Sequence, residues 1–247
     1  MISFDRSLIT KPTKLLDNEY KKRIYLDLYD KDGNVKPRWN SIRENNIRVV
    51  RDYLINITKG CCTYCGKKIK DSDMDVDHFL PSHEYNYLAY CLDNLVPSCK
   101  KCNQNYKNKF VPNEIKGKKI IEACMEQELE EFDYIYDKDI ILNELCSESR
   151  LIEPTFDNVE EHVNFNPEFY MYEAKTKIGE NTISMFFDKS EFVGELEEIS
   201  NMVKEIVEKN RDDNYEIIEF LIRAQGYDFY YNKFYEYWQN EKVNNRL

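Results

Sequence analysis

The spacing of apolar residues predicts that both ends of the chain are largely helical. Apolar positions recur every three or four residues in the segments Lys118 to Leu129, Phe192 to Glu208 and Asn214 to Trp238, which is the period of an amphipathic helix. The segment from Asn18 to Ile57 is also helix-like, on both sides of a turn predicted at Asp32-Gly33-Asn34. We therefore expect helical regions before and after a different, central unit.

The central unit has the pattern of a strand followed by a helix. Residues Met74 to Phe79 alternate between polar and apolar and lead to Pro81, as a short strand does. Neighbouring side chains of a strand point to opposite faces, so Asp77 and His78 are expected on opposite sides. The polar stretch from Lys100 to Lys107 predicts that a helix begins there.

Two Cys-x2-Cys pairs, 33 residues apart, flank this strand: Cys62 with Cys65, and Cys99 with Cys102. Four thiolates in two such pairs are the usual ligand set of a structural Zn²⁺. Two disulfides are the alternative, but no apolar signal segment precedes the first residues, so we expect a reducing, cytoplasmic setting. A zinc ion closed by four thiolates cannot activate water, so any catalysis must use other residues. The remaining cysteines are expected to be free thiols: Cys61, Cys91, Cys124 and Cys146.

The two halves of the chain differ in net charge. The chain is 42% hydrophobic, which is enough for a sizeable core, and has no apolar run long enough to span a membrane. Its formal charge is −11, but residues 1–119 carry 23 basic and 15 acidic side chains (+8), whereas residues 120–247 carry 12 and 31 (−19). The basic half is suited to a polyanion, and the acidic half is expected to dock a protein.

Several basic residues near the cysteine pairs are candidate contacts to nucleic-acid phosphates, although each is also compatible with an ordinary solvated surface. Before the first pair these are Arg38, Arg43, Arg48 and Arg51. After it they are Lys100, Lys101, Lys107 and Lys109, followed by Lys116, Lys118 and Lys119.

Residues 59–110 resemble the HNH endonucleases, in the variant whose two Cys-x2-Cys knuckles bind zinc and whose last motif residue is Asn. The shared order is a cysteine pair, Asp77-His78, Asn94-Leu95, a second cysteine pair, and Asn103 followed by a lysine. Lys107 comes one place later than the commonest spacing, which leaves its role open. The resemblance implies a ββα-metal fold and cleavage that leaves 5′-phosphate ends.

The resemblance also implies roles that elementary chemistry supports. The neutral imidazole of His78 is suited to take a proton from water. Asn94 would hold that ring through a hydrogen bond that fixes its tautomer. Asp77 and Asn103 would offer oxygen ligands to a divalent cation, for which Mg²⁺ or Mn²⁺ fits better than a second zinc. A less specific interpretation is a non-catalytic zinc ribbon in which Asp77 and His78 cap a turn.

Two further histidines and an aromatic cluster have structural interpretations. His83 lies in a polar loop and is expected on the surface, and His162 is expected to be structural. The aromatic residues between Tyr227 and Trp238 could stack on bases, but the acidic residues among them favour a core or a subunit interface. A looser resemblance, in residues 151–165 and 182–186, is to bacterial HNH proteins that serve defence systems beside an ATPase, Septu and certain retrons among them.

The sequence therefore predicts an α+β, mainly α protein with an HNH ββα-metal core stapled by a four-cysteine zinc site. The expected parts are a helical N-terminal region (1–58), a nuclease module (59–113) and an acidic helical domain (114–247). The expected function is metal-dependent hydrolysis of DNA, with a partner protein, an ATPase being one candidate. The alternatives are an RNA nuclease, with transfer RNA as one substrate, and a non-catalytic zinc-dependent adaptor. Cutting both DNA strands would require a homodimer or two successive nicks.

Overall fold

The structure is a computed structural model and describes residues 1–112 and 148–247, except for residues 18, 21, 22, 25, 26, 29, 33, 35, 86, 87, 109, 210–212 and 245. The helix predicted from Lys118 to Leu129 lies outside the described residues, as do Gly33, Cys124, Cys146 and four of the candidate phosphate-binding lysines (Lys109, Lys116, Lys118 and Lys119). Among the described residues, no helix combines the length and the apolarity needed to cross a membrane.

Among its described residues, the N-terminal region contains the short 3-10 helices η1 (Arg6–Leu8), η2 (Thr13–Leu16) and η3 (Trp39–Ser41), and then helix α2 (Val49–Ile57). Residues 19–20 and 23–24 are also helical, which agrees with the helix-like pattern predicted there. Helix α2 buries Val50, Tyr53, Leu54 and Ile57 in a small core that also includes Met74 and Leu95 of the central unit, because these residues recur at helical spacing. Where the turn is predicted, Asp30 Oδ1 accepts hydrogen bonds from the backbone N–H groups of Asp32 and Asn34.

The central unit is a hairpin followed by a helix. After η4 (Asp71–Asp73), strand β1 (Met74–His78) pairs antiparallel with β2 (Leu95–Cys99), which follows η6 (Leu92–Asn94). His78 is opposite Leu95, and Met74 is opposite Cys99. This register places the end of β1 beside the start of β2 and brings the second cysteine pair back to the start of β1.

The helix after β2 is a π-helix, η7 (Lys101–Lys107). Its hydrogen bonds join residues five apart, and the N–H of Asn108 donates to the carbonyl oxygen of Asn103 at 2.7 Å. Asn108 adopts a positive φ of 39° and ends the helix. Because the hydrogen-bonded ring of a π-helix encloses one more residue than that of an α-helix, the wider turn accommodates the extra residue before Lys107, and Lys107 contacts Asp77 and His78 of β1.

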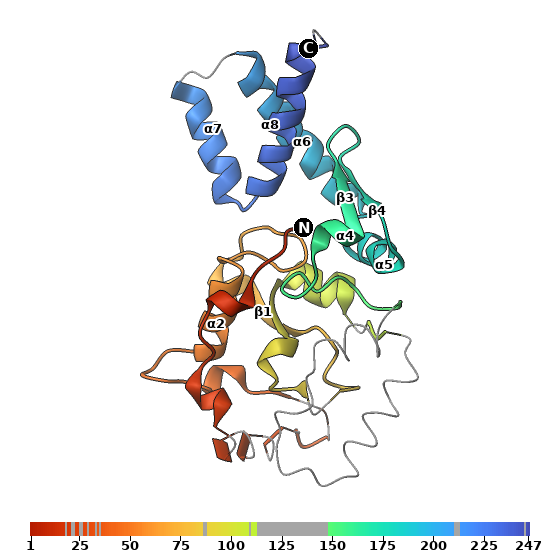
Figure 1. Ribbon diagram of the computed structural model, residues 1–247. Coiled ribbons are helices and arrows are strands. Elements are labelled where there is room, and N and C mark those ends of the chain that lie inside the picture. Colours follow the sequence, from red (N-terminus) through yellow and green to blue (C-terminus); the bar gives the residue numbers. More distant parts are fainter. Residues whose placement is uncertain are drawn as a thin grey trace.

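The C-terminal part contains a hairpin and a helical lobe (Figure 1). Its elements are α4 (Val159–His162), β3 (Val163–Asn166), β4 (Met171–Ala174), α5 (Lys177–Phe186), α6 (Ser190–Glu208), α7 (Asp213–Ala224) and α8 (Asp228–Val243). Helix α6 confirms the prediction over Phe192 to Glu208. The hairpin was not predicted, and the helix predicted from Asn214 to Trp238 is in fact two helices, because Gly226 takes φ +86° between α7 and α8.

The helical lobe packs on the first cysteine knuckle through backbone contact. A Cβ on Gly226 would lie 2.2 Å from the backbone nitrogen of Lys68, so only glycine fits there. The same Lys68 N–H donates to the Gln225 carbonyl at 2.9 Å. Beside it, Lys67 forms an ion pair with Glu195 of α6, and Lys101 pairs with Glu191 at 2.6 Å. The lobe and the knuckles share one hydrophobic core, which includes Cys62, Tyr64, Phe186, Leu196 and Tyr230.

The predictions for the aromatic cluster and the two outlying histidines agree with this packing. Tyr227, Tyr230, Tyr231 and Phe234 are buried in the core of the lobe, so these rings do not stack on bases. His83 is half exposed beside Glu84. His162 Nδ1 hydrogen-bonds the hydroxyl of Thr176 at 2.8 Å, where that residue begins α5, so His162 has a structural role.

Candidate active site and metal centre

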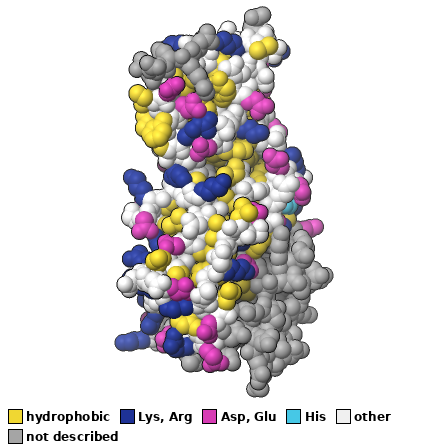
Figure 2. All heavy atoms as spheres, turned by 60° about the vertical axis from the view of Figure 1, so that its left-hand side comes forward, with side chains coloured by type: hydrophobic (Ala, Val, Ile, Leu, Met, Phe, Trp, Pro, Cys, Tyr) yellow, Lys and Arg dark blue, Asp and Glu magenta, His cyan; other side chains and the backbone are white. Residues whose placement is uncertain are grey.

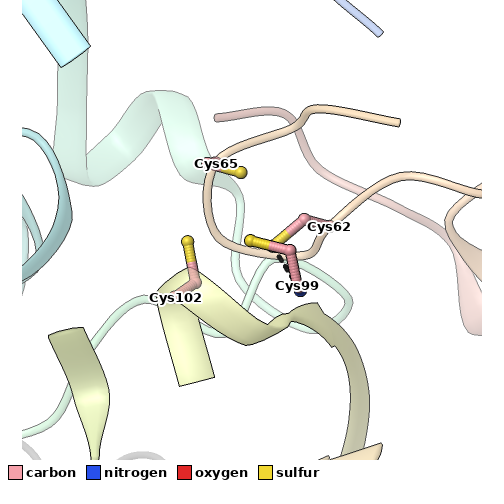
Figure 3. A group of neighbouring side chains, drawn as sticks. All are labelled: Cys62, Cys65, Cys99 and Cys102. Carbon is pink, nitrogen blue, oxygen red and sulfur yellow. Dashed lines mark hydrogen bonds between the residues drawn. The ribbon is translucent and has the colours of Figure 1, made fainter. Parts of the chain in front are cut away.

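Four thiols converge on one point between the two knuckles (Figure 3). Cys62 and Cys65 come from the loop after α2, Cys99 ends β2, and Cys102 lies in η7; their sulfur atoms all lie within 4.8 Å of one another. Sulfur ligands of a tetrahedral zinc ion lie about 3.8 Å apart, which follows from a zinc–sulfur distance of about 2.3 Å. The four cysteines thus form one metal-ligand group, as the sequence predicts.

The backbone around the thiols supports that group. The N–H of Cys99 donates to Cys62 Sγ at 3.4 Å, and Gly66, with φ +77°, makes the tight turn after the first pair. Hydrogen bonding among the four thiols lowers the pKa of Cys99 and raises the pKa of Cys65 and Cys102, so these thiols share their protons as one cluster. Cys61 and Cys91 stay outside the group, and burial raises the pKa of Cys91 to about 11. All six described cysteines are free of disulfides.

A second cluster lies on the face of β1 that meets η7. Its side chains could offer oxygen atoms to a metal ion, and we call it the oxygen cluster. Asp75 and Asp77 share this face because they are two residues apart on a strand. The amide nitrogen of Asn103 donates to Asp75 Oδ2 at 3.1 Å, and Gln104 donates to the same oxygen at 2.8 Å. The expected partner of Asn103 was Asp77, so the structure adds Asp75 to the candidate cation ligands. The spacing rule for strands could have found it.

Asp77 itself is buried and has two donors. Tyr64, between the first two cysteines, donates its hydroxyl hydrogen to Asp77 Oδ2 at 2.5 Å. The ammonium group of Lys107 donates to Asp77 Oδ1 at 3.0 Å and to the carbonyl oxygen of His78 at 2.6 Å. Burial, followed by the charge of Asp77, raises the pKa of Tyr64 well above its usual value, so its hydroxyl remains a donor. Sequence reasoning missed Tyr64, because nothing in a Cys-x2-Cys spacing marks the residues between the cysteines.

Lys107 is therefore inside the site and not on a surface that flanks it. Its side chain is 2% exposed, whereas a contact to a flanking phosphate requires an accessible ammonium group. The prediction that Lys107 binds nucleic acid beside the cut does not hold in this arrangement. The wider turn of the π-helix is the physical reason, since it directs the side chain toward the end of β1.

His78 lies on the opposite face of β1, as strand alternation predicts. Its Nε2 lies 3.0 Å from the carbonyl oxygen of Ala89, and its ring centroid is 5.5 Å from that of Trp39. A carbonyl oxygen only accepts hydrogen bonds, so Nε2 carries the proton and Nδ1 is the ring nitrogen whose lone pair can accept one. Burial lowers the pKa of His78 to about 4, and the ring is neutral at physiological pH.

Asn94 does not hold the ring of His78, which corrects our expectation. Its side-chain oxygen accepts from the Leu80 N–H at 2.8 Å, its amide nitrogen donates to the Leu80 carbonyl at 3.0 Å, and its backbone carbonyl accepts from Phe79 N–H at 2.8 Å. Asn94 is fully buried and thus secures the chain that leaves β1. The tautomer of His78 is set by Ala89, which no sequence signal indicated, because a backbone carbonyl carries no residue identity.

The other candidate phosphate contacts differ in how firmly other groups of the protein hold them. Lys100 is half exposed, 3.9 Å from Asp73, whereas Lys101 is held by Glu191. Arg51 is bonded to Asp71 and to the Met74 carbonyl. On the face shown in Figure 2, basic and acidic side chains are interspersed, so the charge difference between the two halves of the sequence does not form two separate surfaces there.

Comparison with known proteins agrees with this geometry. The family model of the HNH endonuclease matches residues 62–109, which include both cysteine pairs, β1, β2 and η7. Residues 62–109 are therefore an HNH endonuclease domain, as the sequence resemblance predicts.

Two curated relatives are similar to parts of the chain. The Septu protein PtuB of Bacillus thuringiensis is 38% identical over 52 residues, which is 20% of this chain and 20% of that protein. Protein ea31 of Escherichia phage lambda is 28% identical over 118 residues, or 47% of this chain and 36% of that protein. The chain thus covers only about a fifth to a third of the length of these relatives. No solved structure matches it significantly.

Proposed function

We propose that this protein is a metal-dependent HNH endonuclease that hydrolyses phosphodiester bonds of DNA. The observation that carries the proposal is the state of His78, whose Nε2 proton is held by the Ala89 carbonyl so that Nδ1 can accept. A neutral imidazole with a fixed tautomer is what a general base requires. In the proposed reaction, Nδ1 takes the proton from the attacking water while Trp39 limits the rotation of the ring.

The oxygen cluster on the other face of β1 fits a hard divalent cation by its donor chemistry, because carboxylate and amide oxygens suit Mg²⁺ or Mn²⁺. Asp77 and Asp75 would hold the ion, with the side-chain oxygen of Asn103, whose amide nitrogen is already bonded to Asp75. Such an ion would stabilise the negative charge that develops on the phosphate and the leaving oxygen. Lys107 lies where it would share Asp77 with the ion, and its positive charge adds to the attraction for phosphate.

DNA is proposed as the substrate in preference to RNA because the HNH resemblance implies it. Among the residues described around His78 and Asp77, none is placed by its contacts to recognise a ribose hydroxyl, which is the group that separates the two substrates. RNA therefore remains the competing substrate, and the experiment below includes it.

We also propose a role in bacterial defence, together with a partner protein. The similarity to the Septu protein PtuB supports the setting. Support for a partner comes from α7, which exposes Ile217, Phe220 and Leu221 on the lobe far from the nuclease strands (Figure 1). Adjacent exposed apolar side chains of this size often mark a protein interface. An ATPase is the candidate that the looser sequence resemblance suggests.

A non-catalytic adaptor is the second candidate, and one observation favours it: both carboxylate oxygens of Asp77 already have donors, Tyr64 and Lys107. An adaptor would keep the zinc knuckles and bind nucleic acid without cutting it. In that case the oxygen cluster would serve stability alone.

Nicking of supercoiled plasmid separates these possibilities. The purified chain is incubated with plasmid or with structured RNA, in Mg²⁺, in Mn²⁺ and in EDTA. We expect metal-dependent nicking that His78→Ala lowers by at least about 100-fold, the usual contribution of a general base. His83→Ala is the matched control, since His83 is exposed outside the site.

The outcomes are distinct. Cutting of RNA and not of plasmid would show that RNA, and not DNA, is the substrate. Binding without cutting, unchanged by His78→Ala, would favour the adaptor. Activity retained in His78→Ala at the wild-type level would remove His78 from the mechanism.

A further inference from the structure

Tyr64 connects three parts of the molecule that the chemistry described above does not connect. It lies in the first knuckle between Cys62 and Cys65, it is fully buried, and its hydroxyl bonds Asp77 at 2.5 Å. Its ring stacks on Phe186, the last residue of α5, with centroids 4.5 Å apart and planes 14° apart. The thiol group, the oxygen cluster and the C-terminal part thus meet at one side chain.

The position of the ring is set from both ends. On the backbone side, the N–H of Thr63 donates to the Pro97 carbonyl of β2 at 3.0 Å, and the N–H of Gly66 donates to the Cys62 carbonyl at 2.9 Å. On the far side, Phe186 is itself 1% exposed and packs against Phe187. A ring held in this way cannot follow Asp77 if the carboxylate turns, so the hydroxyl works as a fixed point.

The carboxylate of Asp77 also forms an ion pair with the ammonium group of Lys107. Lys107 Nζ lies 3.0 Å from Oδ1 and also 3.0 Å from Oδ2 of Asp77, which is a two-oxygen arrangement. The ammonium group therefore attracts both oxygens equally and does not distinguish them, although an ion pair in a buried site is strongly attractive. The hydroxyl of Tyr64 bonds Oδ2 alone, so the tyrosine distinguishes the two oxygens and limits the rotation of the carboxylate.

We propose that Tyr64 is a positioning residue that orients the Asp77 carboxylate for a divalent cation, and that its ring makes this orientation depend on the packing of α5. The inference rests on the proposed function, because it assigns Asp77 to the cation. It goes further by giving the C-terminal part of the chain a direct influence on the nuclease centre through the contact between Phe186 and Tyr64.

Direct binding of Mn²⁺ to the zinc-loaded full chain tests this without requiring cleavage. Mn²⁺ is observed by electron paramagnetic resonance, and it competes poorly for thiolates, which prefer zinc. We expect Tyr64→Phe to weaken Mn²⁺ binding at least about tenfold, the lower end of the effect of a hydrogen bond to a charged group, with zinc content unchanged. Phe186→Leu, which keeps the hydroxyl but removes the stack, should weaken it by a smaller factor.

Two controls define the result. Tyr53→Phe removes a hydroxyl from a buried tyrosine of the other core and should leave Mn²⁺ binding unchanged. Asp77→Asn identifies the part of the binding that uses Asp77. Equal Mn²⁺ binding by Tyr64→Phe and wild type would overturn the inference, and so would a loss of zinc that explains the whole effect.

The test also separates this inference from the proposed function. If the wild type binds Mn²⁺ through Asp77 but does not cut nucleic acid, the proposed function fails, and the Tyr64→Phe titration still decides the inference. If the wild type cuts and Tyr64→Phe binds Mn²⁺ normally, only the inference fails. If no Mn²⁺ binding depends on Asp77, both the cation assignment and the inference are overturned.

Discussion

The thiol group and the oxygen cluster occupy the same short stretch of structure, yet they are organised in opposite ways. The sulfur atoms point at one another, all within 4.8 Å, from four separate backbone positions. The oxygen donors instead pair with neighbours: Asp75 with Asn103 and Gln104, and Asp77 with Tyr64 and Lys107. Both groups use η7 and the loop after α2; the thiol group adds β2, and the oxygen cluster adds β1.

The difference follows from the hydrogen-bonding capacity of the two kinds of group. Thiols are weak donors and weak acceptors, so they can lie together in an apolar core without strong competing partners. A buried carboxylate cannot be left unpaired, and the chain supplies it with a phenol and an ammonium group. A site for a closed structural metal can therefore be assembled from its ligands alone, whereas a site for an exchangeable cation needs additional residues to support it.

The largest effect we expect comes from removing one thiol. Structural zinc supplies on the order of 10 kcal/mol of folding free energy in small modules, so Cys65→Ser or Cys99→Ser should give insoluble or protease-sensitive protein. Metal analysis should find about one zinc per chain in the wild type. Cys91→Ser is the matched control, because Cys91 lies outside the group, and it should keep its zinc. Soluble, active Cys99→Ser without zinc would contradict the assignment.

Removal of one member of the oxygen cluster should cost less but reveal its internal pairing. Asp77→Ala leaves Lys107 buried without its carboxylate, and breaking a buried pair in this way costs about 3–5 kcal/mol. Asp77→Ala/Lys107→Met should recover a large part of that loss, because no charge is then left unpaired. Denaturant unfolding gives the free energy of unfolding of the wild type, the single variant and the double variant.

Asp75→Ala provides the comparison within the cluster. Asp75 is more exposed than Asp77 and is bonded to amides, so its loss should cost only about 1 kcal/mol. Equal destabilisation by the two substitutions would show that the ion pair of Asp77 and Lys107 has no special weight.

A further pair of substitutions tests the contact between the helical lobe and the first knuckle. Gly226→Ala forces a left-handed residue, which costs about 1–2 kcal/mol, and it drives a methyl group against Lys68. We expect lower thermal stability and faster loss of zinc to a chelator, since the lobe packs on the thiol side. Gly194→Ala, in α6 where a Cβ meets nothing within 4 Å, should be neutral or slightly stabilising. Identical zinc release in both variants would show that the lobe does not support the knuckle.

The sequence by itself determined the parts of the site that depend on residue identity and short spacing. The two cysteine pairs predicted one metal-ligand group, because thiolates three positions apart can reach the same ion. The alternation of β1 predicted that Asp77 and His78 face opposite sides, because strand geometry has a period of two. Helix α6 was also predicted, because apolar residues recur along it every three or four positions.

Only the tertiary structure decided the features that depend on backbone geometry or on contacts between distant segments. The π-helix turned an apparent spacing error at Lys107 into a buried contact with Asp77, and Gly226 divided one predicted helix into two. The ring of His78 is held by the carbonyl of Ala89, and Asp77 by Tyr64. Carbonyl groups are the same in every residue, and contacts across the core follow from packing, so neither leaves a pattern along the chain.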